Sequence, residues 1–159
     1  MPPVVCVFPN GGRSGYRGGV EEMIVDELIP LIDRTYPTRA NAASRAVAGF
    51  SMGGAGAVRL SLLHSDLFCA AGSWGGGMWQ GADQLIAAVQ NLKGKSMAFL
   101  LVNGDRGRPE AYAALTEEMS VLGVPHSVTV VNDTPYNLDL YYKLGGEEMV
   151  RFLSQQLQS

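Results

Sequence analysis

The 159-residue sequence has little of several features that mark other classes of protein. Its two cysteines and two histidines offer few ligands and argue against metal binding. No apolar run reaches the roughly 18 residues that a membrane-spanning helix needs. The formal net charge is −3 and no basic cluster occurs, which argues against nucleic acid and other polyanions as partners. We expect no metal, no cofactor, no nucleic-acid partner and no membrane contact.

The two cysteines, Cys6 and Cys69, both lie in apolar runs typical of strands. This setting favours buried free thiols over a disulfide. Met1-Pro2-Pro3 leads directly into the first of these runs, without the pattern of a signal peptide. We therefore expect a cytoplasmic protein, and a secreted origin stays open.

Hydrophobic residues make up 47% of the chain and charged residues 17%, a balance typical of a compact protein with a covered sheet. Apolar runs of strand type occupy residues 3–8, 45–50, 68–73, 97–102 and 127–131. Helical patterns occupy residues 20–32, 52–64, 82–92, a segment from Pro109 to about Gly123, and 145–157, with a kink or a new turn at Pro30. This alternation predicts one α/β domain over residues 1–159, with a doubly wound parallel sheet of about five strands.

The clearest motif is Gly49-Phe50-Ser51-Met52-Gly53, which follows a strand-like run and precedes small residues that can open a helix. This is the G-x-S-x-G pattern of a nucleophile elbow, in which a sharp strand-to-helix turn exposes the serine hydroxyl. Glycines flank the serine because side chains there would collide with the neighbouring backbone. The pattern predicts Ser51 as a nucleophile and the Met52 N–H as an oxyanion donor. The alternative is a tight turn with an ordinary exposed serine.

Four segments carry a family resemblance: Pro9–Gly12, Glu27–Tyr36, Arg45–Gly54 and His64–Phe68. In this order they resemble the esterase D, feruloyl esterase and enterochelin esterase group of α/β-hydrolases, most strongly over residues 21–72. The resemblance implies hydrolysis of carboxylic esters by a Ser–Asp–His triad.

The chain is short for this family, which has about three more strands ahead of the first one here. One of them normally lies between the strand at 3–8 and the elbow strand, and its loop supplies the second oxyanion N–H. Either residues 3–8 pair directly with 45–50, or the chain is a fragment. In a closed sheet the Asn10-Gly11-Gly12 loop would lie beside Ser51 and offer its N–H groups. A plain strand-ending turn is an equal alternative.

A catalytic serine needs a general base, and the base needs an orienting acid. In the family the acid follows the strand that is here at 97–102, and Asp105 is the only carboxylate close behind it. The family's spacing would place the acid at position 107, which is a glycine here. Asp105 is thus either a shifted triad acid or a solvated loop aspartate.

The resemblance places the base in Pro135-Tyr136-Asn137-Leu138, where this chain has tyrosine instead of histidine. A phenol, with an ordinary pKa of about 10, is a poor base near neutral pH and a better donor to an oxyanion. Tyr136 is therefore either a donor beside Ser51 or a residue that fills the space of the histidine.

Neither histidine of the chain is expected to be the base. His64 ends the helix that begins at the elbow, about 20 Å from Ser51. His126 starts the last strand, at the end of the sheet opposite the active edge and about 15 Å or more from the elbow.

The sequence thus predicts a serine carboxylesterase for small acyl or aryl esters, weak because a lost triad histidine costs about 10⁶ in turnover. The alternative is a non-catalytic relative that binds a ligand or another subunit in the same cleft. Trp74, with Met78 and Trp79, is expected to wall a substrate pocket, to pack as a lid or to contact a partner. A short sheet leaves an edge strand open, so a homodimer is expected, and a base from the partner is one remedy for the missing histidine.

Overall fold

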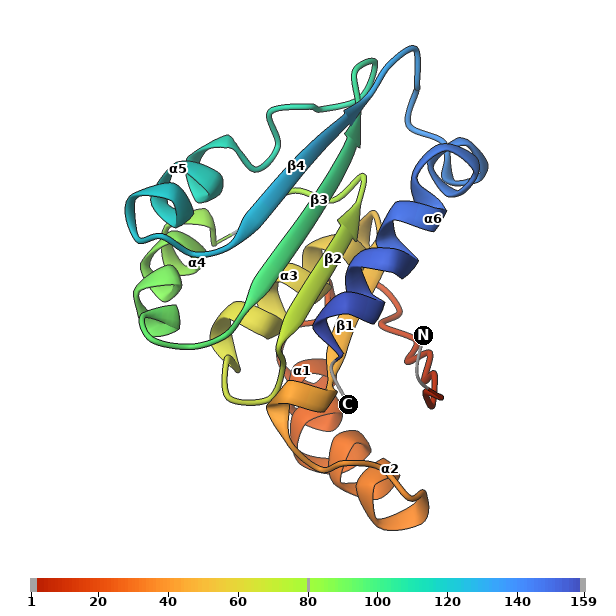
Figure 1. Cartoon of the computed structure of the whole chain (residues 1–159), viewed down its shortest axis with the longest axis vertical. Helices are drawn as coiled ribbons and strands as arrows, with labels where there is room; N and C mark the ends of the chain where they lie inside the picture. The colour runs from red at the N-terminus through yellow and green to blue at the C-terminus, as the bar shows by residue number, and fades with distance from the viewer. Residues whose placement is uncertain (1–2, 80, 158–159) are drawn as a thin grey trace.

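The computed structural model describes residues 3–79 and 81–157, which contain a sheet of four parallel strands. The strands β1 (Ala46–Phe50), β2 (Ala70–Trp74), β3 (Ala98–Gly104) and β4 (His126–Val131) lie side by side in that order (Figure 1). Ala46 is opposite Ala70, which is opposite Ala98, so the first three strands are in step. The predicted α/β class with a parallel sheet is confirmed, with four strands in place of about five.

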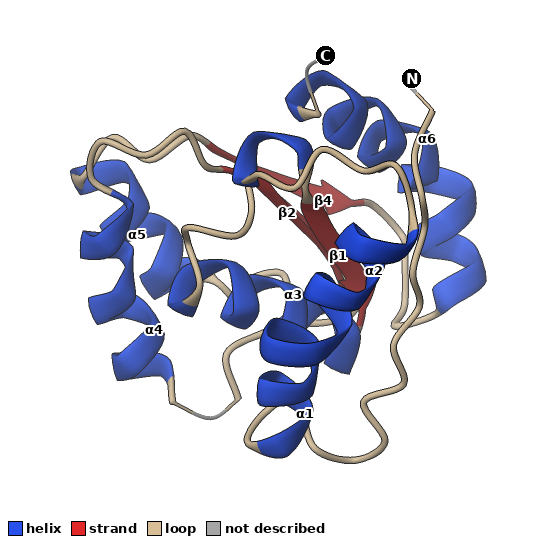
Figure 2. Cartoon of the chain, turned by 90° about the horizontal axis from the view of Figure 1, so that it is seen from below, coloured by secondary structure: helices blue, strands red, loops and turns tan. Residues whose placement is uncertain are grey.

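Helices cover both faces of the sheet (Figure 2). One face carries α3 (Met52–Leu63), α4 (Ala82–Ala88) and α5 (Ala113–Val121), and α6 (Leu138–Gln156) crosses the other. Short 3-10 helices occupy Ala42–Ser44 and Val89–Leu92. β3 is apolar on both sides because Phe99 and Leu101 face the larger core under α3–α5, and Leu100 and Val102 face the smaller core under α6.

A continuous helical segment precedes β1 and packs on the side of α3. It consists of α1 (Gly19–Glu22), the π-helical stretch η1 (Met23–Leu28) and α2 (Ile29–Thr35). Pro30 is at the start of α2, directly after the π-helical stretch. Proline has no N–H, so the carbonyl one turn earlier loses its usual donor and the hydrogen-bond pattern changes there. The new turn predicted at Pro30 is confirmed.

Residues 3–8 do not form the predicted strand. Among the described residues β1 pairs only with β2, so its other edge is open and the direct pairing of 3–8 with 45–50 is absent. A strand needs neighbouring backbone to satisfy its N–H and C=O groups, and the described chain offers this segment none. Phe8 is accordingly 91% exposed. Met1 and Pro2, on which the expectation of no leader rests, lie outside the described residues.

The two cysteines differ in environment. Both thiols are free, as predicted. Cys69 at the start of β2 is buried, and burial raises the pKa of its thiol. Cys6 is exposed, so the prediction that it is buried is wrong, because the strand that was to bury it does not form.

The helix predicted from Pro109 begins later, at Ala113. The residues between form turns, in which the Ala111 N–H donates to Arg108 O at 3.1 Å and the Ala113 N–H donates to Glu110 O at 2.9 Å. Proline opens this segment without starting the α-helix itself.

The last helix begins seven residues earlier than the predicted 145. The side chain of Asn137 accepts a hydrogen bond from the Leu140 N–H at 3.1 Å and caps the helix. Gly145 lies inside α6, where a Cβ would come 3.5 Å from Val102 and 3.6 Å from Trp74. These are ordinary van der Waals distances, so Gly145 lies inside an unbroken helix that packs on the sheet. No helix among the described residues is both long enough and apolar enough to cross a membrane.

Glu21 on α1 joins the N-terminal helical segment to α3. Its carboxylate accepts from the Arg59 guanidinium at 3.0 Å and lies 2.8 Å from His64 Nε2. Burial alone would raise the pKa of Glu21, but the hydrogen bonds to His64 and Arg59 outweigh it and hold that pKa below its ordinary value. The carboxylate thus stays ionised and keeps both contacts near neutral pH.

Replacing Glu21 with glutamine is expected to lower the free energy of unfolding by about 1–2 kcal/mol at neutral pH, because charge-assisted hydrogen bonds are lost. A pKa that is lowered on folding gives stability that is present above the unfolded-state pKa and is lost as the pH falls through the folded-state pKa. Urea titrations at neutral pH and at about pH 3 should therefore show the difference from wild type shrinking at the lower pH. Glu22→Gln, on the exposed neighbour, is the control. Equal losses in the two variants would contradict this role for Glu21.

Candidate active site

Ser51 lies between the end of β1 and the start of α3, with φ 57° and ψ −118°. This backbone region is costly for any residue with a Cβ and is the strained conformation of a nucleophile elbow. The Ser51 N–H donates to the Trp74 carbonyl at 2.7 Å, which ties the turn to the end of β2.

The chain around the turn leaves no room for side chains at Gly49 and Gly54. At Gly53 a Cβ would meet only the Tyr16 hydroxyl, at 4.0 Å, so the predicted collision occurs at Gly49 and the prediction is wrong for Gly53. A Cβ on Gly49 would lie 2.5 Å from the carbonyl carbon of Gly53, and a Cβ on Gly54 would lie 2.5 Å from Ser73 Oγ. These close approaches place the N-terminus of α3 directly at the serine. Met52 is the first residue of α3, so its N–H has no acceptor within the helix and points outward with the positive end of the helix dipole.

A buried polar pair lies under the turn. Ser73 Oγ and Tyr112 Oη are 2.9 Å apart, and both side chains are buried. Burial raises the pKa of Tyr112, so this hydroxyl stays neutral and serves as a hydrogen-bonding support. Gly76 passes over the pair so closely that a Cβ would lie 2.3 Å from Ser73 Oγ. The loop after β2 is thereby held against the elbow.

The structure brings Tyr136 to Ser51. The Tyr136 hydroxyl donates a hydrogen bond to Ser51 Oγ. Its ring packs against Phe50, with ring centroids 5.2 Å apart, and lies over Gly75, where a Cβ would come 3.1 Å from the ring. Ser51 therefore has a phenol beside it, at the position where the family resemblance places an imidazole.

Asp105 holds the loop that leads to Tyr136. Its Oδ2 accepts from the Asp133 N–H at 2.9 Å, and its Oδ1 accepts from the Thr134 N–H at 3.0 Å. No hydrogen bond among the described residues joins Asp105 to Tyr136 or Ser51. Both carboxylate oxygens are thus occupied by backbone amides two and three residues before Tyr136.

Both histidines have partners away from Ser51. His64 caps the far end of α3 and contacts Glu21. His126 Nδ1 lies 2.8 Å from the Val124 carbonyl oxygen, and its Nε2 lies 3.3 Å from Ser120 Oγ. Neither ring is placed to take a proton from Ser51. No group of His, Cys, Asp and Glu side chains within residues 3–79 and 81–157 is suited to hold a metal ion.

The glycine-rich loop at residues 10–12 reaches α3 through Tyr16. The Tyr16 ring lies between Gly11 and Gly56, where a Cβ would approach it to 2.7 Å and 2.5 Å respectively. A Cβ on Gly53 would lie 4.0 Å from the Tyr16 hydroxyl, so the loop is near the elbow.

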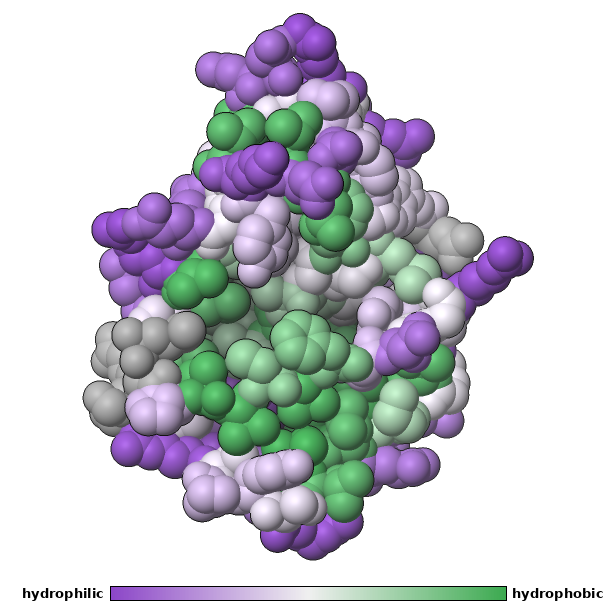
Figure 3. Space-filling view, turned by 90° about the vertical axis from the view of Figure 1, so that its right-hand side faces the viewer, coloured by the Kyte–Doolittle hydropathy of each residue, from purple (hydrophilic) through white to green (hydrophobic). Residues whose placement is uncertain are grey.

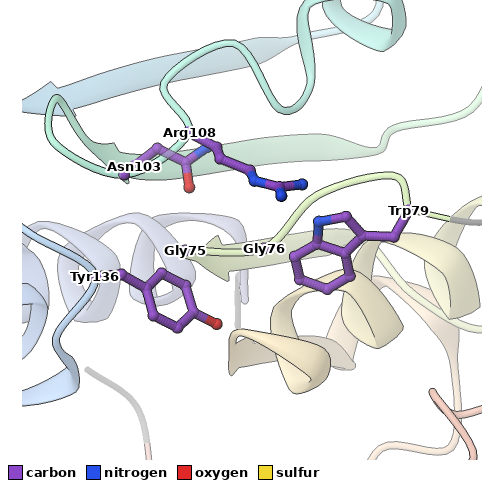
Figure 4. Close-up of a pocket in the computed structure, with 7 residues that line it drawn as sticks. Gly75, Gly76, Trp79, Asn103, Arg108 and Tyr136 are labelled. Carbon is purple, nitrogen blue, oxygen red and sulfur yellow. The ribbon is translucent and has the colours of Figure 1, made fainter.

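Two cavities beside the elbow share Trp79 in their linings. The first, which we call the Tyr136 cavity, has a volume of about 390 Å³ and is lined by Gly75, Gly76, Trp79, Asn103, Gly107, Arg108 and Tyr136 (Figure 4). The second, the Met52 cavity, has a volume of about 180 Å³ and is lined by Arg13, Ser14, Gly15, Arg17, Met52, Ala55, Arg59, Gly77, Met78, Trp79 and Leu85. Tyr136, in the lining of the first cavity, hydrogen-bonds to Ser51, and Met52, in the lining of the second, follows Ser51 in the chain. The two cavities therefore flank Ser51.

Trp74 lies in neither lining. Its ring is 6.1 Å from that of Tyr142 and packs in the smaller core under α6. Its Nε1 is buried without an acceptor among the described residues. Of the residues expected to wall a pocket, Met78 and Trp79 line the cavities, while Trp74 packs on the opposite face of the sheet.

Sequence reasoning missed Asn103, Arg108 and Tyr112. Asn103 is a polar residue near the carboxyl end of a parallel strand, the edge at which such sheets bind ligands, and this signal was available. Arg108 and Tyr112 follow in a segment without periodicity, so only the folded chain shows that they lie at the site.

Gly49→Ala is expected to lower the free energy of unfolding by about 3 kcal/mol or more, because its Cβ would collide with the Gly53 backbone. Thermal and urea unfolding measure the loss. Gly19→Ala is the matched control, because a Cβ on Gly19 meets nothing within 4 Å and an alanine is favoured at a helix start over glycine. A Gly49→Ala protein as stable as the control would contradict the steric account of the elbow.

The family described as "Putative esterase" matches residues 3–154 of the chain. An endo-1,4-beta-xylanase/feruloyl esterase of Xylanibacter ruminicola is 31% identical over 132 residues, which cover 77% of this chain and 17% of that protein. An esterase of Mycobacterium tuberculosis is 34% identical over 84 residues, which cover 46% of this chain and 18% of that protein. The chain thus spans less than a fifth of the length of these curated relatives.

Solved structures share the fold. A ferulic acid esterase superposes with a TM-score of 0.72 at 22% identity, over 87% of this chain and 62% of its own. A fluorophosphonate-binding serine hydrolase of Staphylococcus aureus superposes with a TM-score of 0.71 at 14% identity, over 95% of this chain and 70% of its own. With the family match over nearly its whole length, the chain belongs to the esterase family of the α/β-hydrolase superfamily.

Proposed function

We propose that this chain hydrolyses small acyl or aryl carboxylic esters slowly, with Ser51 as the nucleophile. The observation that carries the proposal is the conformation of Ser51, with φ 57° at the N-terminus of α3. This turn presents a hydroxyl beside unpaired helix N–H groups, which is the arrangement that acyl transfer requires. Membership of an esterase family supports the same reaction.

In the proposed reaction Ser51 Oγ attacks the ester carbonyl carbon, and the carbonyl oxygen becomes an oxyanion at the N-terminus of α3. The Met52 N–H donates to this oxyanion. The N–H groups of Asn10 and Gly11 are proposed as further donors, because that of Gly12 already donates to the Asn10 side chain at 2.9 Å. The alcohol leaves with the serine proton, and water then releases the acyl group as a carboxylic acid.

Tyr136 makes the proposed reaction slow. Its hydroxyl donates a hydrogen bond to Ser51 Oγ. This bond uses a lone pair with which Ser51 Oγ would attack the ester carbonyl carbon. A phenol accepts the serine proton poorly at neutral pH. Loss of a triad histidine costs about 10⁶ in turnover and leaves about 10³–10⁴ over water from binding and oxyanion stabilisation. Slow hydrolysis is therefore expected.

We propose Asp105 as a positioning residue. Its carboxylate accepts from the Asp133 and Thr134 N–H groups and so fixes the turn that carries Tyr136 to Ser51. In a chain with histidine at 136, Asp105 would position the histidine by holding this turn. It would not bond to the imidazole, because both carboxylate oxygens already accept hydrogen bonds from the backbone.

A second function, ligand binding without turnover, is favoured by the same Tyr136 contact. A hydrogen bond from a phenol caps the nucleophile, while the cavity of about 390 Å³ beside it remains available to a ligand. The two functions differ in whether Ser51 reacts. A fluorophosphonate adduct on Ser51, seen by intact mass, supports the esterase, and the absence of an adduct supports the binding protein.

A homodimer through the open edge of β1 is also proposed. β1 pairs on one side only among the described residues. Val5 and Phe8 are exposed and belong to the N-terminal segment, which Figures 1 and 2 show on the β1 side of the sheet. Figure 3 views the side of the molecule that carries the N-terminal segment and α6, and apolar residues gather in its lower half. An unpaired strand edge flanked by apolar surface favours association with a second copy.

Tyr136→His is expected to raise kcat/KM for p-nitrophenyl butyrate at least about 100-fold, the lower end of what a general base contributes. Ser51→Ala in the same background should remove the gain. A gain that survives loss of the Ser51 hydroxyl would show that the histidine activates water and would sink the nucleophile proposal. If the unmodified chain is already fast and Ser51→Ala abolishes it, the account of Tyr136 is wrong.

Size-exclusion chromatography at several concentrations is expected to show a dimer that dissociates on dilution. Val5→Lys, which adds charge beside the open edge, should shift the equilibrium towards monomer. Val128→Lys, on the exposed face of β4 at the other side of the sheet, is the control. A strict monomer at high concentration would exclude both the dimer and a base supplied by a partner.

A further inference from the structure

The Tyr136 cavity contains polar groups that the proposed ester hydrolysis does not use. Its volume of about 390 Å³ is within the range of small-molecule sites. In Figure 4 Tyr136 and Trp79 stand on opposite sides of the cavity, and Asn103 and Arg108 enter it from β3 and the loop that follows. Because the Tyr136 hydroxyl reaches Ser51 Oγ, a group bound here lies next to the nucleophile.

Asn103 presents an amide to the cavity. The residue is 2% exposed and lines the cavity, and Trp74 Nε1 is the one buried side-chain polar atom without a partner among the described residues, so the Asn103 amide is open to whatever occupies the cavity. Figure 4 shows the amide at the wall of the cavity, with its oxygen directed inward. An amide that is open to the cavity can hydrogen-bond to water, and a polar group of a ligand can take the place of that water.

Arg108 has a guanidinium that pairs with no described residue. None of the acidic residues close to it in the chain or in the next loop pairs with Arg108. Asp133 forms an ion pair with Arg106, and Asp105 accepts hydrogen bonds from two backbone N–H groups. Glu110 forms no ion pair within the described chain. No acidic side chain lines the cavity, although the chain has a net charge of −3. The cavity therefore has an uncompensated positive charge.

We propose that the Tyr136 cavity takes an acyl group that ends in a free carboxylate, so that the substrate is a hemiester of a short dicarboxylic acid. Arg108 pairs with the free carboxylate, the Asn103 amide turns its NH2 group inward to donate a hydrogen bond to the acyl group, and Trp79 contacts its methylene groups. The reaction rests on the proposed esterase function, whereas the binding does not. Hydrolysis breaks the bond between the acyl carbon and the alcohol oxygen and adds water, giving the dicarboxylic acid and the alcohol.

Calorimetric titration of the unmodified chain with glutarate and valerate tests binding without turnover, and succinate and adipate vary the spacing. A charge-assisted pair at an exposed guanidinium should make the best dicarboxylate bind roughly 10-fold more tightly than valerate. Arg108→Gln should bring this ratio close to one, and Arg108→Lys should retain most of it. Arg39→Gln, at an exposed arginine in the loop before β1, should leave the ratio unchanged. If no dicarboxylate binds more tightly than valerate, the inference is overturned.

Turnover separates this inference from the esterase proposal. In the Tyr136→His background, p-nitrophenyl hemiglutarate should have a kcat/KM roughly 10-fold above that of p-nitrophenyl valerate, and Arg108→Gln should remove the difference. Equal, Ser51-dependent hydrolysis of both esters would overturn the inference and leave the esterase proposal standing. Preferential dicarboxylate binding without any Ser51-dependent hydrolysis would support the inference and overturn the esterase proposal.

Discussion

The site depends on one steric constraint: the chain turns from β1 into α3 only because no side chain lies where Gly49 meets Gly53. This contact sets the distance between the strand end and the helix, and so fixes Ser51 at φ 57°. The same closeness leaves Gly54 against Ser73, whose hydroxyl pairs with Tyr112 from the segment before α5. The turn at Ser51 thus helps to position the hydrogen bond between the Ser73 and Tyr112 hydroxyls, which come from other parts of the chain. Loosening the turn would disturb the conformation of Ser51 and the buried Ser73–Tyr112 pair together.

The features that the sequence predicts well are those that depend on neighbours along the chain. The strained turn at Ser51 follows from the G-x-S-x-G pattern, in which Gly49 leaves room for the Gly53 backbone. The change from π-helix to α-helix near Pro30 follows from a missing N–H. The strand expected at 3–8 fails because its existence depends on a partner that the described chain lacks. The start of α6 was predicted seven residues late, and the hydrogen bond from the Leu140 N–H to the Asn137 side chain caps the helix at its actual start. The apolar pattern identified Trp74 as an aromatic near the active edge, but only the register of β2 decides which face it occupies.

The site residues also divide into those set by neighbours along the chain and those set by contacts between distant segments. Ser51 is set by local geometry, whereas Tyr136 reaches it from a loop 85 residues later, and the position of that loop is fixed by Asp105. The bonds from Asp105 to the loop are made to backbone amides, so they hold whatever side chain stands at 136. The loop is therefore held beside Ser51 whether residue 136 is a histidine or a tyrosine. A tyrosine can occupy the place of the base without disturbing the fold, because its ring gains contact with Phe50.

Whether the hydroxyl at position 51 has a use can be argued from strain. Glycine enters the backbone region at φ 57° and ψ −118° freely, while other residues do so at a cost of order 1–3 kcal/mol. Packing requires glycine at 49 and 54, and backbone strain favours it at 51 as well, yet serine stands there. Its one side-chain hydrogen bond within the described chain joins it to Tyr136, whose side chain is 51% exposed, and such a bond contributes only about 1 kcal/mol. Stability alone therefore gives no reason to prefer serine over glycine at this position. A hydroxyl held in that conformation at a helix N-terminus, between two cavities, is better accounted for by a reaction or a ligand than by the fold.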